Sequence, residues 1–235
     1  MAILQKEGKQ SQEKLTTNQR RLLIKNDNFA VQEAYKTLRT NVRFCLQGTG
    51  CKRICITSAM SGEGKSITFL NLAISIAEAG QKVLLIDADL RRPAVARLTG
   101  KMATPGLSNV LAGLVKAEEA IRKEIYPNMD VIFSGDIPPN PSELLGTEAF
   151  RSLIETLSEQ YEYILIDAPP VNVVSDACII ANCVDGVLVL VRQGRSRKDA
   201  VKQAVNNLQL TGAKVLGFVL NGVELDTGKK YGYYT

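Results

Sequence analysis

The stretch Ser58–Ser66, SAMSGEGKS, contains the residue types that a phosphate-binding loop needs. Gly62 and Gly64 allow the backbone to turn its N–H groups inward, around an anion at a helix N-terminus. Lys65 is placed to reach the β- and γ-phosphates of a nucleotide, and the hydroxyl of Ser66 to bind Mg²⁺. An apolar run precedes the loop and a helical pattern follows it, as such a loop requires. The sequence therefore predicts a nucleotide phosphate site, the alternative being a flexible glycine turn with an exposed lysine.

Ala59 occupies the position at which the usual loop pattern has its first glycine. Alanine can replace that glycine where the backbone needs no positive φ. Its presence therefore weakens the match to the motif more than it weakens the case for phosphate binding. The last apolar run ends in LNGVE and lacks the Asn-Lys-x-Asp pattern of guanine-specific switches, which favours ATP and makes Asn221 a candidate adenine contact. The expected nucleotide-binding residues are Ser61, Gly62, Glu63, Gly64, Lys65, Ser66, Ile67 and Asn221.

Three aspartates follow apolar runs that are typical of strands. Asp87 and Asp89 come at the end of VLLIDAD, and Asp167 at the end of YILID. Because ligands bind beyond the carboxyl ends of parallel strands, all three carboxylates should converge on the phosphate loop. Mg²⁺ takes one or two carboxylates together with phosphate oxygens, so a third can orient or deprotonate a nucleophile. The alternative for any one of them is a helix cap or an ion pair with Arg91 or Arg92.

The composition limits the other chemistry that the chain can do. It contains no histidine, which excludes histidine triads, histidine metal ligands and imidazole acid–base catalysis. Catalysis must then depend on carboxylates, lysine, arginine or a bound metal. The five cysteines have no C-x-x-C spacing, so we expect free thiols, with a metal or redox role as the alternative.

Short apolar runs alternate with helical patterns along the chain. The runs are rich in Val, Ile and Leu, as is typical of strands that are buried on both faces. This pattern predicts an α/β protein with the three-layer P-loop NTPase fold, in which helices cover both faces of a central, mostly parallel sheet. Expected strands cover 53–58, 82–87, 130–134, 163–167, 186–191 and 214–220. Expected helices cover 29–44 and 65–79, with Gly80 as a stop, and a further long helix opens at Asn140-Pro141-Ser142-Glu143.

The 235 residues suffice for one sizeable α/β domain. We expect a mobile basic arm at 1–28, the P-loop domain at 29–225 and a flexible, tyrosine-containing tail at 226–235. Residues 1–53 carry 11 Lys and Arg against 4 Asp and Glu, which favours contact with an anionic membrane surface or an acidic partner. A solubilising tail is the alternative. No apolar run approaches the roughly 20 residues of a membrane span, and no signal peptide is present, which predicts a cytoplasmic protein.

These motifs together resemble the bacterial tyrosine kinases of capsular and exopolysaccharide assembly. SAMSGEGKS is similar to their Walker A motif, LLIDADLRRP to their second aspartate-containing motif and ILIDAPP to Walker B, with PPNPSELL between the last two. The resemblance runs from about Glu33 to the C-terminus. It implies an ATP-dependent, non-specific protein-tyrosine kinase that phosphorylates its own C-terminal tyrosines and regulates polysaccharide synthesis and export.

The resemblance also implies a role for each site residue, with ATP and Mg²⁺ as cofactors. Lys65 and Ser66 look like the phosphate and Mg²⁺ contacts. Asp89 and Asp167 look like the residues that hold the metal or its waters. Asp87 looks like the base for an incoming tyrosine hydroxyl, and we leave open whether it is a metal ligand instead.

In the family, a Glu-x-x-Arg-x-x-Arg run near the N-terminus helps to build a ring-shaped oligomer. Here the corresponding residues are Glu33, Lys36 and Arg39. Lysine keeps the charge of the first arginine but loses the planar fork that suits bidentate pairing. The resemblance therefore implies a ring, and an ordinary charged helix face is the alternative.

Three tyrosines close to the C-terminus resemble the tyrosine cluster that the family phosphorylates, mostly between subunits. They are Tyr231, Tyr233 and Tyr234. Ten extended residues separate Asn221 from Tyr231 and span roughly 33–36 Å, enough to reach a neighbouring active site. The alternative is that these aromatic side chains pack on the surface of the domain.

The family's usual arrangement includes a membrane protein whose cytoplasmic end activates the kinase. This chain resembles the stand-alone form, which lies at the inner face of the membrane through that partner. We expect protein tyrosines as substrates, and no nucleic acid as a partner. The alternative function is a switch ATPase of the plasmid-partition or division-site kind, although Met60 stands where those proteins have a signature lysine. A third possibility is a nucleotide-responsive scaffold.

Overall fold

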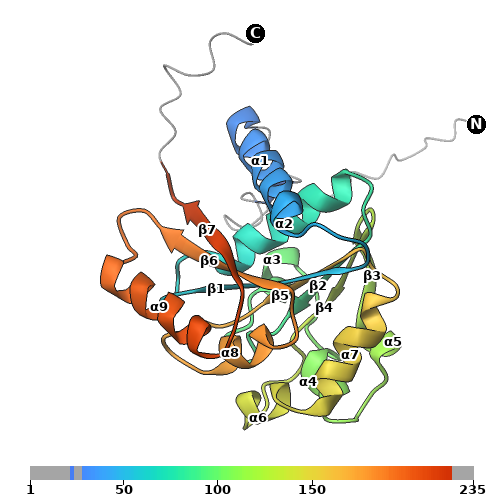
Figure 1. Cartoon of the computed structure of the whole chain (residues 1–235). Coiled ribbons are helices and arrows are strands. Elements are labelled where there is room, and N and C mark those ends of the chain that lie inside the picture. The colour runs from blue at the N-terminus through green and yellow to red at the C-terminus, as the bar shows by residue number, and fades with distance from the viewer. Residues whose placement is uncertain (1–21, 24–27, 224–235) are drawn as a thin grey trace, which may run out of the picture.

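The structure is a computed structural model of the chain, and it describes residues 22–23 and 28–223 (Figure 1). The predicted tail at 226–235 lies outside the described residues, as does most of the predicted arm. Leu22 and Leu23 are buried, and the backbone N–H of Leu23 donates to Asn71 Oδ1 at 2.8 Å. This short piece of the arm therefore packs against the domain.

Within the described residues, a seven-stranded sheet has the order β3-β4-β2-β5-β1-β6-β7. Every neighbouring pair is parallel except β3 and β4, so the predicted mostly parallel sheet is confirmed. Because β1 lies between β5 and β6, the loop that follows β1 is near the middle of the carboxyl edge of the sheet. The strands are β1 (Lys52–Ser58), β2 (Val83–Asp87), β3 (Ile121–Tyr126), β4 (Met129–Ile132), β5 (Tyr163–Asp167), β6 (Gly186–Arg192) and β7 (Val215–Asn221).

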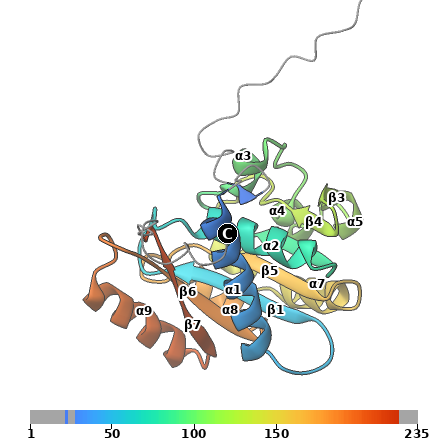
Figure 2. The ribbon, with the colours of Figure 1, turned by 90° about the horizontal axis from the view of Figure 1, so that it is seen from above.

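Helices cover both faces of the sheet, which makes the three layers that the sequence predicts (Figures 1 and 2). One face carries α1 (Phe29–Cys45), α2 (Lys65–Glu78) and α3 (Val95–Thr99). The other face carries α4 (Leu107–Leu111), α5 (Ala117–Ala120), α6 (Pro141–Leu145), α7 (Glu148–Ser158), α8 (Asp176–Ala181) and α9 (Lys198–Leu210). No helix in the described part of the chain combines the length and the apolar character that a bilayer crossing requires.

The core forms two apolar clusters, one on each face of the sheet. Strands β2 and β5 are buried along their whole length, as their uninterrupted apolar sequences predict. Helix α2 is buried on most of its surface, and it places Phe69 at the centre of its cluster with no exposed area. Burying one such side chain stabilises the fold by about 1.5–3 kcal/mol relative to leaving it in water. The helix that starts at the phosphate loop is therefore held firmly by packing.

The structure departs from the predicted elements in two places. Strand β3 was not expected, because its sequence IRKEIY is charged and short, as suits an edge strand. The predicted long helix from Asn140 is wrong: α6 ends at Leu145 and α7 begins at Glu148. The side chain of Asn140 makes no cap hydrogen bond, whereas Pro141 does occupy the first turn. Gly80 has a φ of 83° directly beyond α2, so the predicted stop is confirmed.

All five cysteines lie in the described residues and have free thiols, as predicted. Cys55 is fully buried within β1, and burial raises the pKa of its thiol beyond the usual range. A thiol that stays protonated in an apolar core is unreactive.

Phe69→Ala should lower the free energy of unfolding by about 3–5 kcal/mol, because it leaves a cavity in the apolar cluster that packs α2 against the sheet. Phe44→Ala is the matched control, since Phe44 is 62% exposed on α1, and a surface change of this kind alters stability by less than about 0.5 kcal/mol. Urea unfolding of both variants measures the difference. Equal losses in the two variants would contradict the described packing of α2.

Candidate active site

The phosphate loop connects Ser58, the last residue of β1, to Lys65, the first residue of α2. Gly62 and Gly64 have φ angles of 77° and 102°, a conformation that L side chains rarely adopt. Ala59 has no positive φ and is fully buried, which confirms that alanine can stand in place of the first glycine. The loop is thus shaped to turn backbone N–H groups toward an anion at the N-terminus of α2.

Two side chains support the phosphate loop: Glu63, which belongs to the loop, and Asn221 at the end of β7. The buried carboxylate of Glu63 accepts hydrogen bonds from Met60 N (3.2 Å) and from Ser196 Oγ. Asn221 Nδ2 donates to the backbone oxygen of Glu63 at 2.9 Å. The side chain of Glu63 therefore stabilises the loop, and its contact with a nucleotide stays a prediction. Asn221 also holds the loop, and its contact with adenine stays a prediction.

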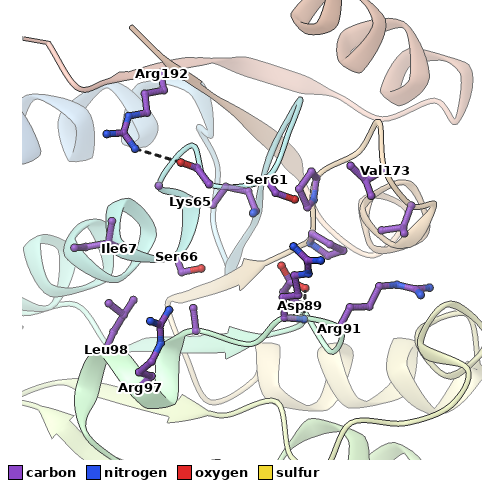
Figure 3. A pocket seen from close by; sticks show the side chains of 17 residues that line it. Ser61, Lys65, Ser66, Ile67, Asp89, Arg91, Arg97, Leu98, Val173 and Arg192 are labelled. Atoms are coloured by element: carbon purple, nitrogen blue, oxygen red, sulfur yellow. Dashed lines mark hydrogen bonds between the residues drawn. The ribbon is translucent and has the colours of Figure 1, made fainter. Parts of the chain in front are cut away.

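Two arginines at and just beyond the end of β6, Arg192 and Arg195, reach the same loop. Arg192 Nη1 donates to the backbone oxygen of Gly62 at 3.2 Å (Figure 3), and Arg195 Nη2 donates to that of Ser61 at 3.5 Å. These contacts occupy loop carbonyls, so the guanidinium groups lie beside the loop that would hold the phosphates. Both therefore add positive charge where a triphosphate would bind.

The three strand-end aspartates converge as predicted. Asp87 and Asp167 are register partners at the ends of neighbouring strands β2 and β5, and neither has any exposed area. Asp89 lies two residues further on, where it lines the cavity in front of the phosphate loop (Figure 3). The charge of Lys65 acts on both Asp89 and Asp167, which places this lysine among the carboxylates.

The carboxylates differ in how many hydrogen bonds they accept. Asp87 Oδ2 accepts from Ala94 N (3.2 Å) and Val95 N (3.0 Å), so Asp87 caps α3, and the alternative that one aspartate is a helix cap holds for it. Within residues 22–23 and 28–223, its Oδ1 has no hydrogen-bond partner. In the same part of the chain, neither oxygen of the fully buried Asp167 accepts a hydrogen bond of normal geometry, although the nearby Ser66 hydroxyl helps to lower its pKa. Three buried carboxylate oxygens are therefore available to a group that the chain does not supply.

Burial is the main influence on the pKa values of these three carboxyl groups. It raises the pKa of Asp167 to about 6, and the positive charge of Lys65 opposes the rise. Burial and then the neighbouring charge of Asp167 raise the pKa of Asp87 well above its usual range. Burial also raises the pKa of Asp89, again against the charge of Lys65. A bound cation would reverse these shifts by favouring the ionised carboxylates.

In the described part of the chain, no three Asp, Glu, Cys or His side chains are arranged to hold a metal ion by themselves. Mg²⁺ does not need such a cage, since it commonly binds one or two carboxylates, keeps several waters and takes phosphate oxygens from the substrate. Ser66 and Asp89 line the cavity, and the buried carboxylate of Asp167 interacts with Lys65, Ser66 and Asp89. These residues fit a nucleotide-bound Mg²⁺.

The cavity in front of the loop has a volume of about 640 Å³, within the range of ligand sites in proteins. Its lining is rich in arginine, a feature that the predicted site residues did not include. Only Asp89 among the lining residues carries a negative charge, and the cations are Lys65, Arg91, Arg92, Arg97 and Arg192. The RR pair in LLIDADLRRP and the arginines of VRQGRSRKD were signals for part of this lining, Arg192 included, but nothing in the sequence showed that Arg97 would join it.

Arg91 forms a network away from the strand-end aspartates. Its Nε and Nη2 donate to the carboxylate of Asp176 at 2.9 and 3.2 Å, and Nη2 also donates to Ser142 Oγ at 2.8 Å. Ser142 Oγ in turn donates to Asp176 at 2.6 Å, and Asp176 is fully buried. The alternative in which Arg91 pairs with a strand-end aspartate is therefore wrong. Instead, α6 and α8 fix Arg91 at the cavity wall.

The residues expected to build a ring lie on α1. Lys36 Nζ and Glu33 Oε1 form an ion pair at 2.7 Å within the helix, where Lys36 is exposed and Glu33 is half-buried. Arg39 is directed to its own domain, where its Nη1 donates to the backbone oxygen of Ser75 in α2. In this arrangement Arg39 joins α1 to α2, and its part in a ring stays a prediction.

Comparison with known proteins gives one consistent picture. A family model described as an AAA domain matches residues 51–215. The tyrosine-protein kinase YwqD of Bacillus subtilis (strain 168) is 40% identical over 202 residues, which cover 86% of this chain and 85% of that protein. The kinase domain of the Escherichia coli tyrosine kinase ETK has a TM-score of 0.79 at 36% identity, over 86% of this chain and 80% of that chain. The chimerical protein CapA2B2 has a TM-score of 0.80 at 36% identity, over 85% of this chain and 88% of that chain.

A protein of the division-site kind is also similar, but less so. The septum site-determining protein MinD of Pyrococcus horikoshii, solved with Mg-ADP, has a TM-score of 0.63 at 26% identity. The match covers 72% of this chain and 70% of that chain. Both measures therefore favour the tyrosine kinases over the switch ATPases.

Asp167→Asn should stabilise the protein when no nucleotide is bound. At low pH the carboxyl group is neutral in the folded and unfolded states, so the two proteins should be equally stable. As the pH rises from the ordinary value of 3.8 through about 6, the wild type must either keep the group protonated or bury a charge, and it loses stability that the variant keeps. A shift of this size corresponds to about 3 kcal/mol.

Thermal melting of the metal-free, nucleotide-free proteins across this pH range measures the difference. Asp199→Asn is the control, because Asp199 is an exposed aspartate on α9. A gap between wild type and Asp167→Asn that does not grow with pH would contradict the described burial of Asp167.

Proposed function

The chain belongs to the bacterial tyrosine-protein kinases, and from that premise we propose that it transfers the γ-phosphoryl group of ATP to tyrosine hydroxyl groups, its own C-terminal tyrosines included. The observation that carries this proposal is the set of free, buried carboxylate oxygens at Asp87 and Asp167, which lie next to Lys65 and a phosphate loop. Such a set is suited to bind a cation with a triphosphate and to accept a proton.

Phosphoryl transfer depends on positioning and on charge stabilisation. Backbone N–H groups of the loop and Lys65 would hold the phosphates and stabilise the charge that develops on the transferring group. Mg²⁺, held by Ser66, Asp89 and Asp167, would supply further positive charge at the phosphate oxygens. These assignments rest on the position of each residue at the cavity and on the free oxygens of Asp167.

We assign proton acceptance to Asp87. The tyrosine oxygen forms the new bond to phosphorus, the bond to the leaving oxygen of ADP breaks, and the phenolic proton passes to the carboxylate. The unpartnered Oδ1 of Asp87 supports this assignment, because it leaves one carboxylate oxygen open to the phenolic proton. The two backbone N–H groups that bind Oδ2 fix the orientation of the carboxylate.

The acceptor residues that we propose are Tyr231, Tyr233 and Tyr234, which lie outside the described residues. Lys229 and Lys230 precede them directly. The last described residue is Val223, so about eight extended residues, or roughly 26–29 Å of chain, lead from it to Tyr231. This length supports transfer to the tail of a neighbouring copy.

We further propose that the kinase acts in capsular or exopolysaccharide synthesis, in a ring of copies that is activated by a membrane-embedded partner at the inner face of the membrane. Relatives that carry the name tyrosine-protein kinase CpsD support the first part. The basic surplus in residues 1–53 suits an anionic membrane surface. Glu33, Lys36 and Arg39 are the candidates for ring contacts.

Lys65→Met should lower tail phosphorylation at least 100-fold, because it removes a positive charge from the transferring group. The measurement is mass spectrometry of the protein after incubation with Mg·ATP and a cytoplasmic activator fragment. Lys82→Met is the matched control, since Lys82 is exposed and lies ahead of β2, at the opposite edge of the sheet. Release of ADP and free phosphate without phosphotyrosine in the wild type would support the switch ATPase instead.

Asp87→Asn should keep the affinity for Mg·ATP within about twofold but lower transfer by 100-fold or more, as expected for loss of a base. Asparagine retains an oxygen that can accept from Ala94 and Val95, so the cap on α3 persists. Calorimetric titration with a non-hydrolysable ATP analogue and the tail-labelling assay separate the two effects. Loss of nucleotide binding together with transfer would show that Asp87 is a metal ligand.

A further inference from the structure

Two arginines on the α3 side of the cavity have no part in the mechanism above. Arg92 lies in the loop before α3, and Arg97 lies within α3. Both side chains line the cavity and are exposed. Figure 3 shows Arg97 with Leu98 below Ser66 and Ile67, whereas Arg192 lies on the other side of Lys65. Arg92 and Arg97 therefore give the cavity a positively charged side that is separate from Arg192.

The arginines of the cavity differ in what they bind. Arg91 is paired with Asp176, and Arg192 donates to the backbone of the phosphate loop. The guanidinium groups of Arg92 and Arg97 have no carboxylate or carbonyl partner among residues 22–23 and 28–223. Unpaired guanidinium groups beside a cavity are well suited to bind a carboxylate or a phosphate, since their planar fork matches both.

Backbone hydrogen bonds join the segment that carries Arg92 and Arg97 to the carboxylates of Asp89 and Asp87. Arg92 N donates to Asp89 Oδ1 at 3.0 Å. Ala94 N and Val95 N donate to Asp87 Oδ2 at 3.2 and 3.0 Å. Three backbone hydrogen bonds thus set the distance between the arginines and the proposed base. A group that binds to Arg92 or Arg97 is therefore held at a set distance from the site of phosphoryl transfer.

This side of the cavity can admit an acceptor tyrosine. The loop and Lys65 hold the phosphates at the N-terminus of α2, and the β7 side of the loop is occupied by Asn221. In-line transfer requires the attacking oxygen to lie opposite the leaving oxygen, beyond the carboxylates. There the wall of the cavity is formed by Ile67, Ala94 and Leu98, which suit an aromatic ring.

We propose that Arg92 and Arg97 bind an anionic side chain next to the acceptor tyrosine, and so determine which tyrosines are phosphorylated well. The inference rests on the proposed kinase function. The ligand is a carboxylate of Asp or Glu, or the phosphate of a neighbouring phosphotyrosine, which carries about −1.5 to −2 charges. In the tail, Tyr233 and Tyr234 lie two and three residues after Tyr231. Phosphorylation of Tyr231 would then make its neighbours better acceptors.

The test uses the full-length protein with a peptide of residues 224–235 in three forms. The first carries Tyr231→Phe as the neutral reference, the second carries Tyr231→Glu, and the third is phosphorylated at Tyr231. The kcat/KM for transfer to the remaining tyrosines is measured with saturating Mg·ATP. Binding of the same peptides in excess Mg·ADP is measured by fluorescence anisotropy, which does not depend on transfer.

We expect both anionic peptides to have a kcat/KM and an affinity about tenfold above those of the neutral peptide, which corresponds to about 1.4 kcal/mol. Arg97→Glu and Arg92→Glu should abolish or invert this preference, while Arg97→Lys keeps part of it. Lys101→Glu is the matched control: it makes the same charge change just beyond α3, at an exposed residue outside the cavity lining. A preference for the phosphorylated peptide alone would identify phosphate as the ligand, and an equal preference for Glu a carboxylate.

Equal values for the three peptides in the wild type would overturn the inference, and so would a preference that survives in both Arg→Glu variants. Binding that prefers the anionic peptides without transfer to any of them has a different meaning. It would contradict the proposed kinase function and still support the anion site.

Discussion

The burial of two carboxylates side by side, at the ends of β2 and β5, is the constraint on which the rest of the site depends. Asp87 and Asp167 are register partners without exposed area, and three of their four oxygens accept no hydrogen bond from the described part of the chain. Like charges in such a place are costly unless a cation joins them. Lys65, at the start of α2, supplies one positive charge, and the packing of α2 holds it there. The two carboxylates carry more negative charge than Lys65 offsets, and a nucleotide-bound Mg²⁺ would neutralise the excess. The affinity for the metal and the affinity for the triphosphate are therefore coupled.

Much of this arrangement follows from the sequence. Uninterrupted apolar runs require strands that are buried on both faces, and parallel strands bring their carboxyl ends to one edge. The sequence alone therefore predicts that Asp87, Asp89 and Asp167 lie beside the phosphate loop. The shape of the loop at Ala59 was also predictable, since only a positive φ would have demanded glycine. Strand β3 was not, because a short charged edge strand lacks the apolar pattern that identifies the others.

The parts of the site that were missed depend on tertiary contacts. Arg91 is held by Asp176, which is 85 positions further along the chain, and no local pattern marks the pair. The hydrogen bond between Glu63 and Ser196, which supports the phosphate loop, joins residues 133 positions apart and likewise has no local pattern. Arg97 belongs to a five-residue helix, and its place at the cavity is set by the hydrogen bonds that Asp87 accepts from that helix. A sequence motif identifies the residues that contact a ligand. The residues that orient them come from distant parts of the chain.

The most direct test of this account is crystallographic, with the protein bound to Mn²⁺ and a non-hydrolysable ATP analogue. The account predicts an anomalous manganese peak that contacts Ser66 Oγ and the triphosphate, and faces the carboxylates of Asp89 and Asp167 directly or through a bound water. Manganese bound away from these carboxylates, or an ordered triphosphate on the loop without any metal, would contradict the claim that the buried aspartates exist to hold a cation.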